Sequence, residues 1–287
     1  MTAALLSGLA NGAAYALFAM GIVIVYKTSR TFNLAQGEFG TVAAYIAYLF
    51  VAHTSLPYWV AIMVALASSV VMAIAIERAA IWPLRNASRV DALVATAAIT
   101  GSVIAVETLL SGGASYVVPS IISGEAFSLG GTAVSNEWVL TGIVMLVTVT
   151  VVALFFGRNM NGVAIKAAAS EPMAARIVGI ALGRASAISW GMAGLLGGIA
   201  GVLLAPLTTI SAGEFTTNAL VAALAATVLG GLTSIAGACV GGLIIGVTES
   251  LSITYLGNSI PGAASLVELA IVLIVLLSRP RGLLGAK

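Results

Sequence analysis

Residues 157–184 read GRNMNGVAIKAAASEPMAARIVGIALGR and form the longest polar stretch of an otherwise apolar chain. Pro172 suits the first position of a helix and Gly179 suits the position just past its end, so the pattern predicts a short helix over 172–178. A second short helical piece is expected over 163–169. Seven residues at about 1.5 Å each make a rod of roughly 10 Å, which is too short to cross a bilayer. We therefore expect this segment to lie at a membrane surface.

The residues in and around this helix indicate a docking element. Ser170 or Glu171 can cap its start. Small side chains, which let another protein approach the backbone closely, are frequent here: Ala167, Ala168, Ala169, Ala174 and Ala175. The alternative is an ordinary amphipathic connector between two membrane spans.

Composition sets the class of protein. Hydrophobic residues make up 60% of the 287 residues and charged residues only 8%, which is too little polar surface to cover a soluble globule. The fold class is therefore all-α, a polytopic transmembrane helical bundle in a single domain over residues 1–287. The net charge of +2 does not imply a nucleic-acid partner, because the basic residues are explained by membrane topology below. The amino-terminal residues lack the basic region of a secretory signal and count as part of a first span.

Apolar runs place about eight to ten spans along the chain. The runs long enough to cross are 4–26, 34–52, 58–80, 91–111, 136–157, 184–205 and 262–278. Residues 217–252 are apolar but broken at Gly230, Gly231, Thr233 and Ser234, and are expected to form two segments joined by a tight turn.

The basic residues set the orientation. If the first span ends in the cytoplasm, all twelve fall on that side: Lys27, Arg30, Arg78, Arg85, Arg89, Arg158, Lys166, Arg176, Arg184, Arg279, Arg281 and Lys287. Segment 157–184 and the carboxyl terminus are then cytoplasmic. Parity requires that the two segments within 217–252 both cross the membrane, or that both form one re-entrant hairpin.

The acidic residues argue against a proton-coupled carrier. Counting along the spans places Glu77 and Asp91 near the inner surface, and Glu107, Glu249 and Glu268 near the outer one. No charge is therefore expected at the membrane midplane, where such carriers need an ionisable group.

Glycine pairs four residues apart indicate close helix packing, and the sequence lacks the motifs of soluble enzymes. Gly197 and Gly201, Gly237 and Gly241, and Gly242 and Gly246 each share a helix face, for which plain helix packing is preferred over a dedicated dimer motif. The sequence has no G-x-x-x-x-G-K-[ST] phosphate loop and no paired Cys or His at metal-binding spacing, so no catalytic residue and no metal site are predicted.

Five motifs in order resemble one known family. They are LLSGLANGAAYALFAMGIVIVYKTSRTFNLAQGEFGTVAAYIAY near the start, ERAAIWPLRNASRVDALVAT, AIKAAASEPMAARIVGI, LGGLTSIAGACVGGLIIGVTES, and the closing RPRGLLG. The chain resembles the membrane subunits of branched-chain amino acid ABC importers over nearly its whole length. The family's Asn-Leu/Phe-Ala-His/Gln-Gly-Asp/Glu motif corresponds to Asn33 to Glu38.

The resemblance implies a type II importer-like fold in the plasma membrane of a prokaryote. It implies one of two homologous permeases, two cytoplasmic ATP-binding subunits and a soluble substrate-binding protein, with ATP and Mg held by the ATPase partners and no cofactor in this chain. By the same resemblance, the coupling contact with the ATPase is carried by Glu171, Ala174, Ala175 and Gly179. Gln36 departs from the histidine of many relatives, which leaves open leucine, isoleucine and valine against urea, short amides or other carboxylates.

Two other classes of function stay open. One is an ion-coupled or passive secondary transporter or channel for a small polar solute, whose ion sites can be built from backbone carbonyls at broken helices. The other is a membrane scaffold or sensor without a central path.

A repeat inside the chain predicts the translocation path. Ala35-Gln36-Gly37-Glu38-Phe39 matches Ser211-Ala212-Gly213-Glu214-Phe215, and the two copies enter the membrane from opposite sides, as in an inverted repeat. The predicted path residues are Asn33, Gln36, Gly37, Glu38, Gly213, Glu214 and Asn218, with their stretches at the interface with the partner permease. The alternative is coincidence combined with ordinary helix capping.

Overall fold

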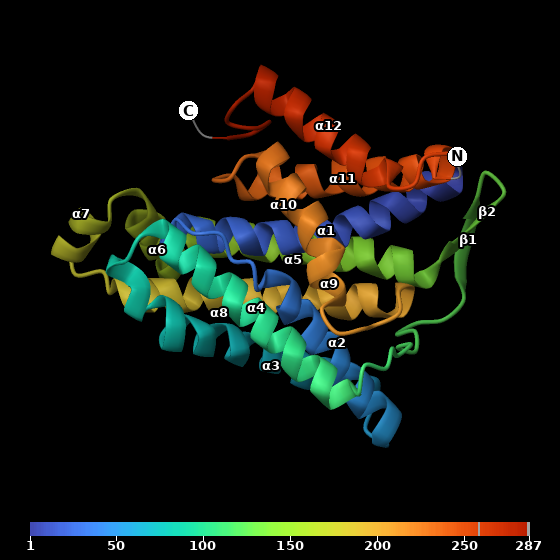
Figure 1. Ribbon diagram of the computed structural model, residues 1–287, viewed down its shortest axis with the longest axis horizontal. Coiled ribbons are helices and arrows are strands. Elements are labelled where there is room, and N and C mark those ends of the chain that lie inside the picture. Colours follow the sequence, from blue (N-terminus) through green and yellow to red (C-terminus); the bar gives the residue numbers. More distant parts are fainter. Residues whose placement is uncertain (258, 286–287) are drawn as a thin grey trace.

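The computed structural model describes residues 1–257 and 259–285, and these form a helical bundle with one small β-hairpin (Figure 1). Lys287, which the sequence assigns to the cytoplasm, lies outside the described residues. The α-helices are α1 (Thr2–Ser29), α2 (Gln36–His53), α3 (Tyr58–Ile76), α4 (Arg89–Ser111), α5 (Asn136–Arg158), α6 (Met160–Ser170), α7 (Pro172–Ile177), α8 (Leu182–Leu204), α9 (Glu214–Thr217), α10 (Ala219–Gly230), α11 (Ile235–Leu256) and α12 (Ala263–Ser278).

The predicted spans agree closely with these helices. Within the described part of the chain, six helical segments are long and apolar enough to cross a membrane, and the apolar segments Glu214–Gly230 and Ala263–Ser278 are shorter. A π-helix, η1 (Glu77–Ile81), extends α3, and short 3-10 helices η2 (Pro83–Asn86) and η3 (Ala205–Leu207) follow α3 and α8.

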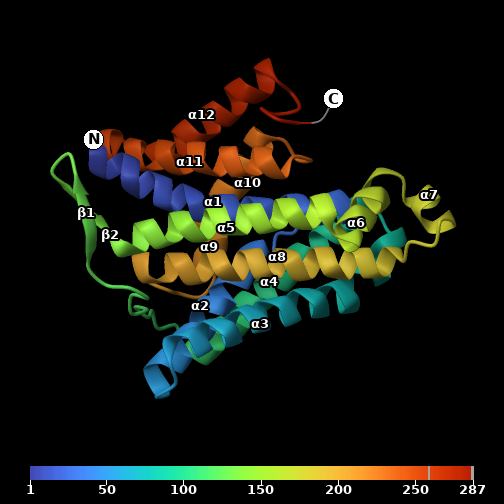
Figure 2. The same cartoon turned by 180° about the vertical axis from the view of Figure 1, so that it is seen from behind.

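Helix α1 lies at the centre of the bundle. Every residue from Ala13 to Val25 is buried, which fits a helix that is apolar on all sides. Gly242 and Gly246 of α11 meet the α1 backbone at Ala16 and Gly12, where a Cβ atom would collide with it. On the far face, seen in Figure 2, α5 lies across α1. Glycine therefore serves helix packing inside the chain, as predicted.

Helix α2 begins inside the bundle rather than at its surface. After α1 the chain turns at Arg30, whose φ of +54° makes it the one non-glycine residue with positive φ among those described. Residues 31–35 then run back along the bundle, and Gln36 donates a 2.9 Å hydrogen bond from Nε2 to the carbonyl of Ala193 in the middle of α8. The run predicted over 34–52 thus forms a helix over nearly those residues, and an extended segment carries the chain inward before that helix begins.

Helix α10 also starts in the interior, from the opposite end of the molecule (Figure 1). The chain leaves α8, passes through residues 205–213 and enters α9, which packs against the start of α2. At its other end α10 joins α11 through a turn next to the carboxyl-terminal segment, where Leu283 and Leu284 donate to the carbonyls of Leu229 and Gly230. This turn lies against Arg281, at the end of the chain that carries basic residues, and whether 217–252 crosses twice or forms a re-entrant hairpin stays a prediction.

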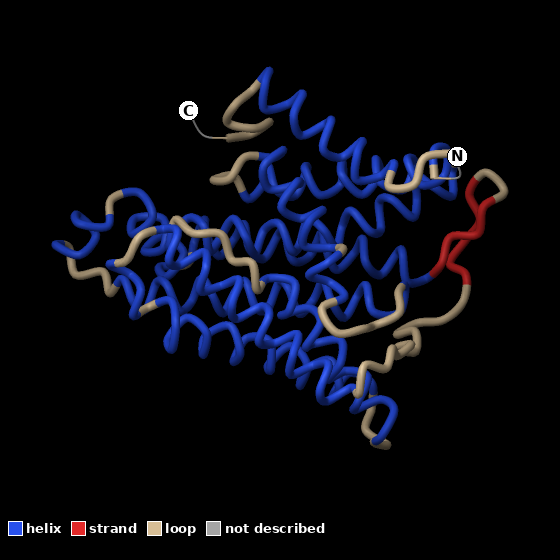
Figure 3. The backbone as a smooth tube through the Cα atoms, in the orientation of Figure 1, coloured by secondary structure: helices blue, strands red, loops and turns tan. Residues whose placement is uncertain are grey.

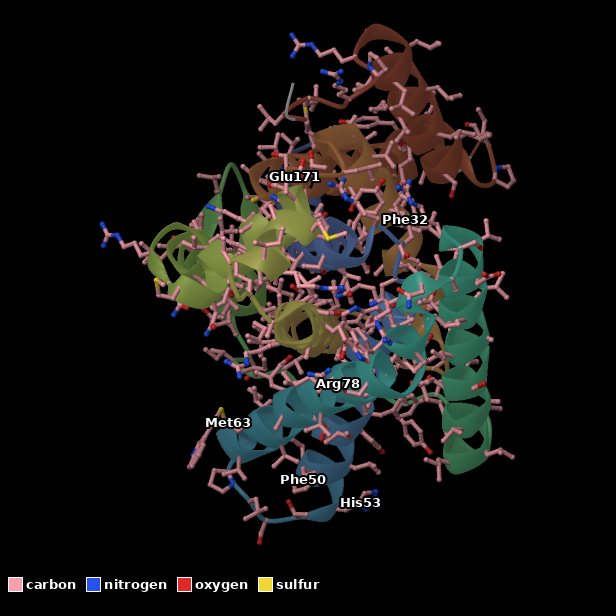
Figure 4. All side chains as sticks on the ribbon, turned by 90° about the vertical axis from the view of Figure 1, so that its left-hand side faces the viewer. Phe32, Phe50, His53, Met63, Arg78 and Glu171 are labelled. Carbon is pink, nitrogen blue, oxygen red and sulfur yellow. The ribbon has the colours of Figure 1, made fainter. Side chains whose placement is uncertain are left out.

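Helix α4 stands at the side of the molecule. In Figure 4, which looks at the end that carries α6 and α7, α4 is set apart from the central helices. It begins with a capping box in which Ser88 and Asp91 bond each other's backbone N–H groups. Its substantial contacts are with α2, η1 and η2.

The loop after α4 contains a feature that the sequence analysis missed. Strands β1 (Glu125–Leu129) and β2 (Thr132–Ser135) pair antiparallel, and Figure 3 shows this hairpin in red at one end of the bundle. Its two-residue turn is Gly130–Gly131, with φ of +57° and +78°, which glycine adopts without strain.

The end of the bundle that carries α6 and α7 also carries the ends of α1 and α12 and the η1–η2 connection (Figure 1). The basic residues of the described part lie on these elements, in the residues that follow α1 and α12, and at the start of α4, the end of α5 and the start of α8. The basic residues, which the sequence predicts on one side of the membrane, therefore lie together at one end of the folded molecule.

Candidate functional site

The segment α6–α7 projects from one end of the bundle and exposes apolar side chains. On and just after α7, Met173, Ile177 and Val178 are 70%, 80% and 75% exposed. Such a cluster on a short surface helix marks an interaction site rather than a packing face.

The predicted coupling residues divide between this surface and the interior. Glu171, Ala174 and Gly179 are exposed, and Gly179 has the positive φ of +85° expected of a residue past a helix end. Ala175 is only 3% exposed and packs into the chain's own core, so its methyl group faces away from any partner. The coupling role predicted for Ala175 stays a prediction, and burial limits it to supporting the helix from inside.

The other small residues are also used differently than predicted. Ala168 and Ala169 are buried in the chain's own packing, because α6 lies on α1, α5 and α8. Glu171 occupies the position before α7, but its side chain makes no capping hydrogen bond. The small side chains of this segment thus mainly allow α6 to pack closely against the other helices of the same chain.

Sequence reasoning missed the apolar residues of α7. Met173 and Ile177 are four positions apart and share a helix face, a spacing that would have predicted an apolar docking stripe on a helix too short to span.

Short-range contacts hold the segment in place. Asn159 caps α6 by accepting a 2.9 Å hydrogen bond from the backbone N–H of Asn161. The N–H of Ile180 donates to the carbonyl of Ala175. Arg30, at the end of α1, donates a 3.0 Å hydrogen bond from Nη2 to the carbonyl of Ala169, so the chain that leads into α2 is tied to α6.

A second candidate site lies in the interior, where α2 and α9 meet. Asn33 and Gln36 are fully buried and form a network at the start of α2. Asn33 donates to Gln36 Oε1 at 3.2 Å and accepts from the N–H of Ala35 at 3.1 Å. Together with the bond from Gln36 to Ala193, the network pairs the buried amide side chains of both residues and ties the start of α2 to α8.

The two copies of the Gly-Glu-Phe repeat face each other at this junction. Gly37 lies against Thr216 so closely that a Cβ atom would collide with its backbone and hydroxyl. Gly213, with φ of +69°, donates its N–H to Glu107 Oε2 of α4 at 3.0 Å. Three separate elements, α2, α4 and α9, therefore converge here.

The second copy is self-contained. Glu214 accepts hydrogen bonds from the Ser211 hydroxyl at 2.6 Å and from Asn218 Nδ2 at 2.8 Å. Asn218 is exposed and Glu214 is partly exposed, so this copy reaches a surface of the chain.

Glu38 is an acidic residue inside the bundle that the sequence analysis did not count. It is fully buried in the first turn of α2, beside the carboxyl group of Glu107. Because α2 starts inside the bundle, an acidic residue lies in the interior after all, and the argument that excluded a carrier on an uncharged midplane does not hold. Among residues 1–257 and 259–285, no group of three His, Cys, Asp or Glu is placed to hold a metal ion.

Comparison with known proteins gives a family. The family described as "Branched-chain amino acid transport system / permease component" matches residues 4–277. No solved structure matches the chain.

Curated relatives match over nearly the whole chain. The high-affinity branched-chain amino acid transport system permease protein LivH of Escherichia coli strain K12 is 30% identical, covering 97% of this chain and 94% of its own. The corresponding protein BraD of Pseudomonas aeruginosa is 28% identical, covering 98% and 94%. A probable branched-chain amino acid transport permease protein LivH of Methanocaldococcus jannaschii is 29% identical, covering 94% and 88%.

Proposed function

The chain belongs to the family of permease components of branched-chain amino acid transport systems, and we propose that it works as the membrane subunit of an ATP-driven importer. It pairs with a homologous permease, takes its solute from a soluble binding protein and is driven by two cytoplasmic ATP-binding subunits. ATP and Mg belong to those subunits. The solute is a branched-chain or closely related amino acid.

The exposed apolar face of α7 carries this proposal. Met173, Ile177 and Val178 stand free on a segment that is too short to span and that lies at the basic end of the bundle. Burying each such side chain against a partner contributes about 1.5–3 kcal/mol. A groove on the ATPase subunit is the partner that this position favours, because the excess of Lys and Arg assigns the same end to the cytoplasm.

The same orientation supports the membrane topology. With α7 in the cytoplasm, the plasma membrane holds the bundle and the β1–β2 hairpin lies outside. Segment 157–184 and the carboxyl-terminal residues lie inside.

The junction of α2 and α9 supports a solute path. Gly37 and Gly213 bring the two interior helix starts together, while Glu214 and Asn218 lead from the junction to a surface that the second permease covers. The side-chain amides of Asn33 and Gln36 are used in hydrogen bonds that hold the start of α2 in place. We therefore infer that these two residues position the junction.

The substitution Ile177→Asp tests the proposal. A charge in a desolvated groove without a partner is unfavourable by several kcal/mol, so we expect at least a 10-fold loss of substrate-stimulated ATP hydrolysis and of uptake. Ala174→Asp, on the exposed side of the same helix, should behave alike, and co-purification of the ATPase subunits reports the contact directly.

Asn161→Asp provides the matched control. It adds the same charge to the exposed first turn of α6, outside the α7 face, and should leave both activities intact. Normal uptake and normal ATPase co-purification in Ile177→Asp would overturn the assignment of α7.

A further inference from the structure

A cleft of about 420 Å³ lies at the end of the bundle that carries α7, the end that faces the viewer in Figure 4. Its walls come from three parts of the chain: the turn after α1, the connection from η1 to the start of α4, and the segment from α6 to the start of α8. Its volume falls within the roughly 300–1,000 Å³ of small-molecule sites. The cleft is therefore large enough for a bound molecule, and it shares no lining residue with the junction of α2 and α9.

The charged side chains that line this cleft are all positive. They are four arginines: Arg30, Arg85, Arg89 and Arg176. In the described part of the chain the one ion pair is that of Glu77 with Arg78, so none of the four arginines has a carboxylate partner there. Asp91 of α4 accepts the backbone N–H of Ser88 and is not part of the wall. A cleft lined by charges of one sign concentrates ions of the opposite sign, which here are anions.

Two of the guanidinium groups are held in place by neighbouring groups. Arg85 donates a 3.0 Å hydrogen bond from Nη1 to the carbonyl of Trp82, and its guanidinium carbon lies 4.9 Å from the centre of the Trp82 ring. Arg30 is held by its bond to the carbonyl of Ala169. Each bond uses one of the five N–H donors of its guanidinium group, so both arginines keep donors for a ligand and lose little side-chain freedom when it binds.

The side of the membrane does not explain why these arginines surround one cleft. An excess of Lys and Arg on the cytoplasmic side requires only that the residues lie on that side. Arg30 also has a φ of +54°, a backbone conformation that glycine adopts with less strain. An arginine at such a position indicates a use for its side chain, because strained backbone is often found where a ligand is held.

The rest of the wall suits a phosphate group that is attached to a larger body. The start of α4 borders the cleft at Ser88 and Arg89, and the start of a long helix favours an anion. Leu84 and Leu182 add apolar surface beside the arginines. Guanidinium groups bind phosphate oxygens in pairs, and four of them suit the several oxygens and the charge of a phosphate better than a single carboxylate.

We propose that this cleft binds a phosphate-bearing anion, which is either the headgroup of an anionic phospholipid or a free phosphate compound. Basic pockets between membrane helices on the cytoplasmic side are suited to such headgroups. The inference goes beyond the proposed function and takes from it only the cytoplasmic side of this end. Because Pro172 and Arg176 belong to α7, a bound phosphate group links α7 to η2 and to the start of α4.

Binding of a free phosphate compound is measured on the full chain in nanodiscs of phosphatidylcholine, whose headgroup has no net charge. The probe in isothermal titration is inorganic pyrophosphate. We expect one pyrophosphate to bind per chain, and to bind more weakly as the salt concentration rises, because salt screens the arginines. Binding of pyrophosphate to the natural sequence should also slow amide hydrogen exchange in residues 172–178.

Arginine variants locate the site. The double variant Arg85→Gln with Arg89→Gln should weaken pyrophosphate binding roughly 10- to 100-fold. Arg85→Lys keeps the charge but loses the planar pair of donors, and should weaken binding about 3- to 10-fold. The matched control, Arg158→Gln with Arg279→Gln, removes two exposed arginines outside the cleft and should bind like the natural sequence. Equal losses in the two double variants would overturn the site.

Nanodiscs that also contain phosphatidylglycerol separate the two sources of phosphate. If the source is lipid, one phosphatidylglycerol per chain stays bound during delipidation in detergent, leaves in the Arg85 and Arg89 double variant, and competes with pyrophosphate. If the source is a free compound, phosphatidylglycerol is not retained and pyrophosphate binds equally well in both kinds of nanodisc. Either result supports the phosphate site, and the absence of both pyrophosphate binding and retained phosphatidylglycerol rejects it.

Acidic side chains of an ATPase subunit are the other possible occupant. In that case the Arg85 and Arg89 double variant loses co-purification of the ATPase subunits, while neither pyrophosphate nor phosphatidylglycerol binds the natural sequence, and the proposal fails. Loss of ATPase coupling in Ile177→Asp together with absent phosphate binding would leave the proposed function standing and reject this site alone.

Discussion

The two copies of the Gly-Glu-Phe repeat differ in how their glutamates are satisfied. Glu38 is fully buried with both oxygens unpartnered, whereas Glu214 is partly exposed and accepts hydrogen bonds from Ser211 and Asn218. The phenylalanines Phe39 and Phe215 are buried in both copies. The same three residues thus build one helix start that is enclosed in the bundle and one that reaches a surface of the chain.

The largest expected difference between the copies is in transport. Glu38→Gln should reduce uptake by about 10- to 100-fold, or about 1.4–2.7 kcal/mol, because it removes a buried carboxyl group from the junction where α2 and α9 meet. Glu214→Gln should change uptake less than about 3-fold, since a glutamine can keep one of the two accepted bonds. Uptake of a radiolabelled branched-chain amino acid into proteoliposomes measures both, and equal losses would remove the functional difference between the copies.

A smaller difference is expected in stability at the glycines. Gly37→Ala puts a methyl group into the backbone of Thr216 and should lower the free energy of unfolding by about 1–3 kcal/mol. Gly213→Ala meets the flexible end of Ile104 at 2.9 Å, and its main cost is the left-handed backbone, about 1–2 kcal/mol. Thermal unfolding in detergent compares them, with Gly142→Ala, which has open space around it, as the control. A Gly213 variant less stable than the Gly37 variant would show that the tight contact at Gly37 relaxes easily.

The smallest effect is expected at the exposed cap of the second copy. Asn218→Ala removes one partner of Glu214 at a surface position and should cost about 0.5–1.5 kcal/mol. In the double variant with Glu214→Ala the two costs should be less than additive, because both changes remove the same bond. Full additivity would mean that this hydrogen bond does not contribute to stability.

The transmembrane helices could be predicted from the sequence because burial in protein and burial in lipid both select apolar runs. The cap around α7 was predictable for a similar reason, since Pro172 and Gly179 each suit one backbone position. The depth of α2 was not predictable, because it depends on how Arg30 to Ala35 fold back and on a hydrogen bond from Gln36 to a distant carbonyl.

The interior site was only half predictable. Glu38 stands in a motif and in a repeat, so both patterns single it out. Glu107 carries no such signal, and its pairing with Glu38 follows from the tilt of α4 and from the Gly213 N–H. The β1–β2 hairpin was missed because its strands are short and the only strong signal is Gly130–Gly131.

The hydrogen bond between Arg30 and Ala169 links the segment that follows α1 to the end of α6. Ala169 lies one residue before the end of α6, close in sequence to the exposed apolar residues of α7, and Arg30 begins the extended segment that leads to Glu38. When a partner pulls on α6, the guanidinium group must follow the carbonyl oxygen or release it. A displacement of α6 is thus coupled, through this hydrogen bond and the segment that follows Arg30, to the helix start at Glu38.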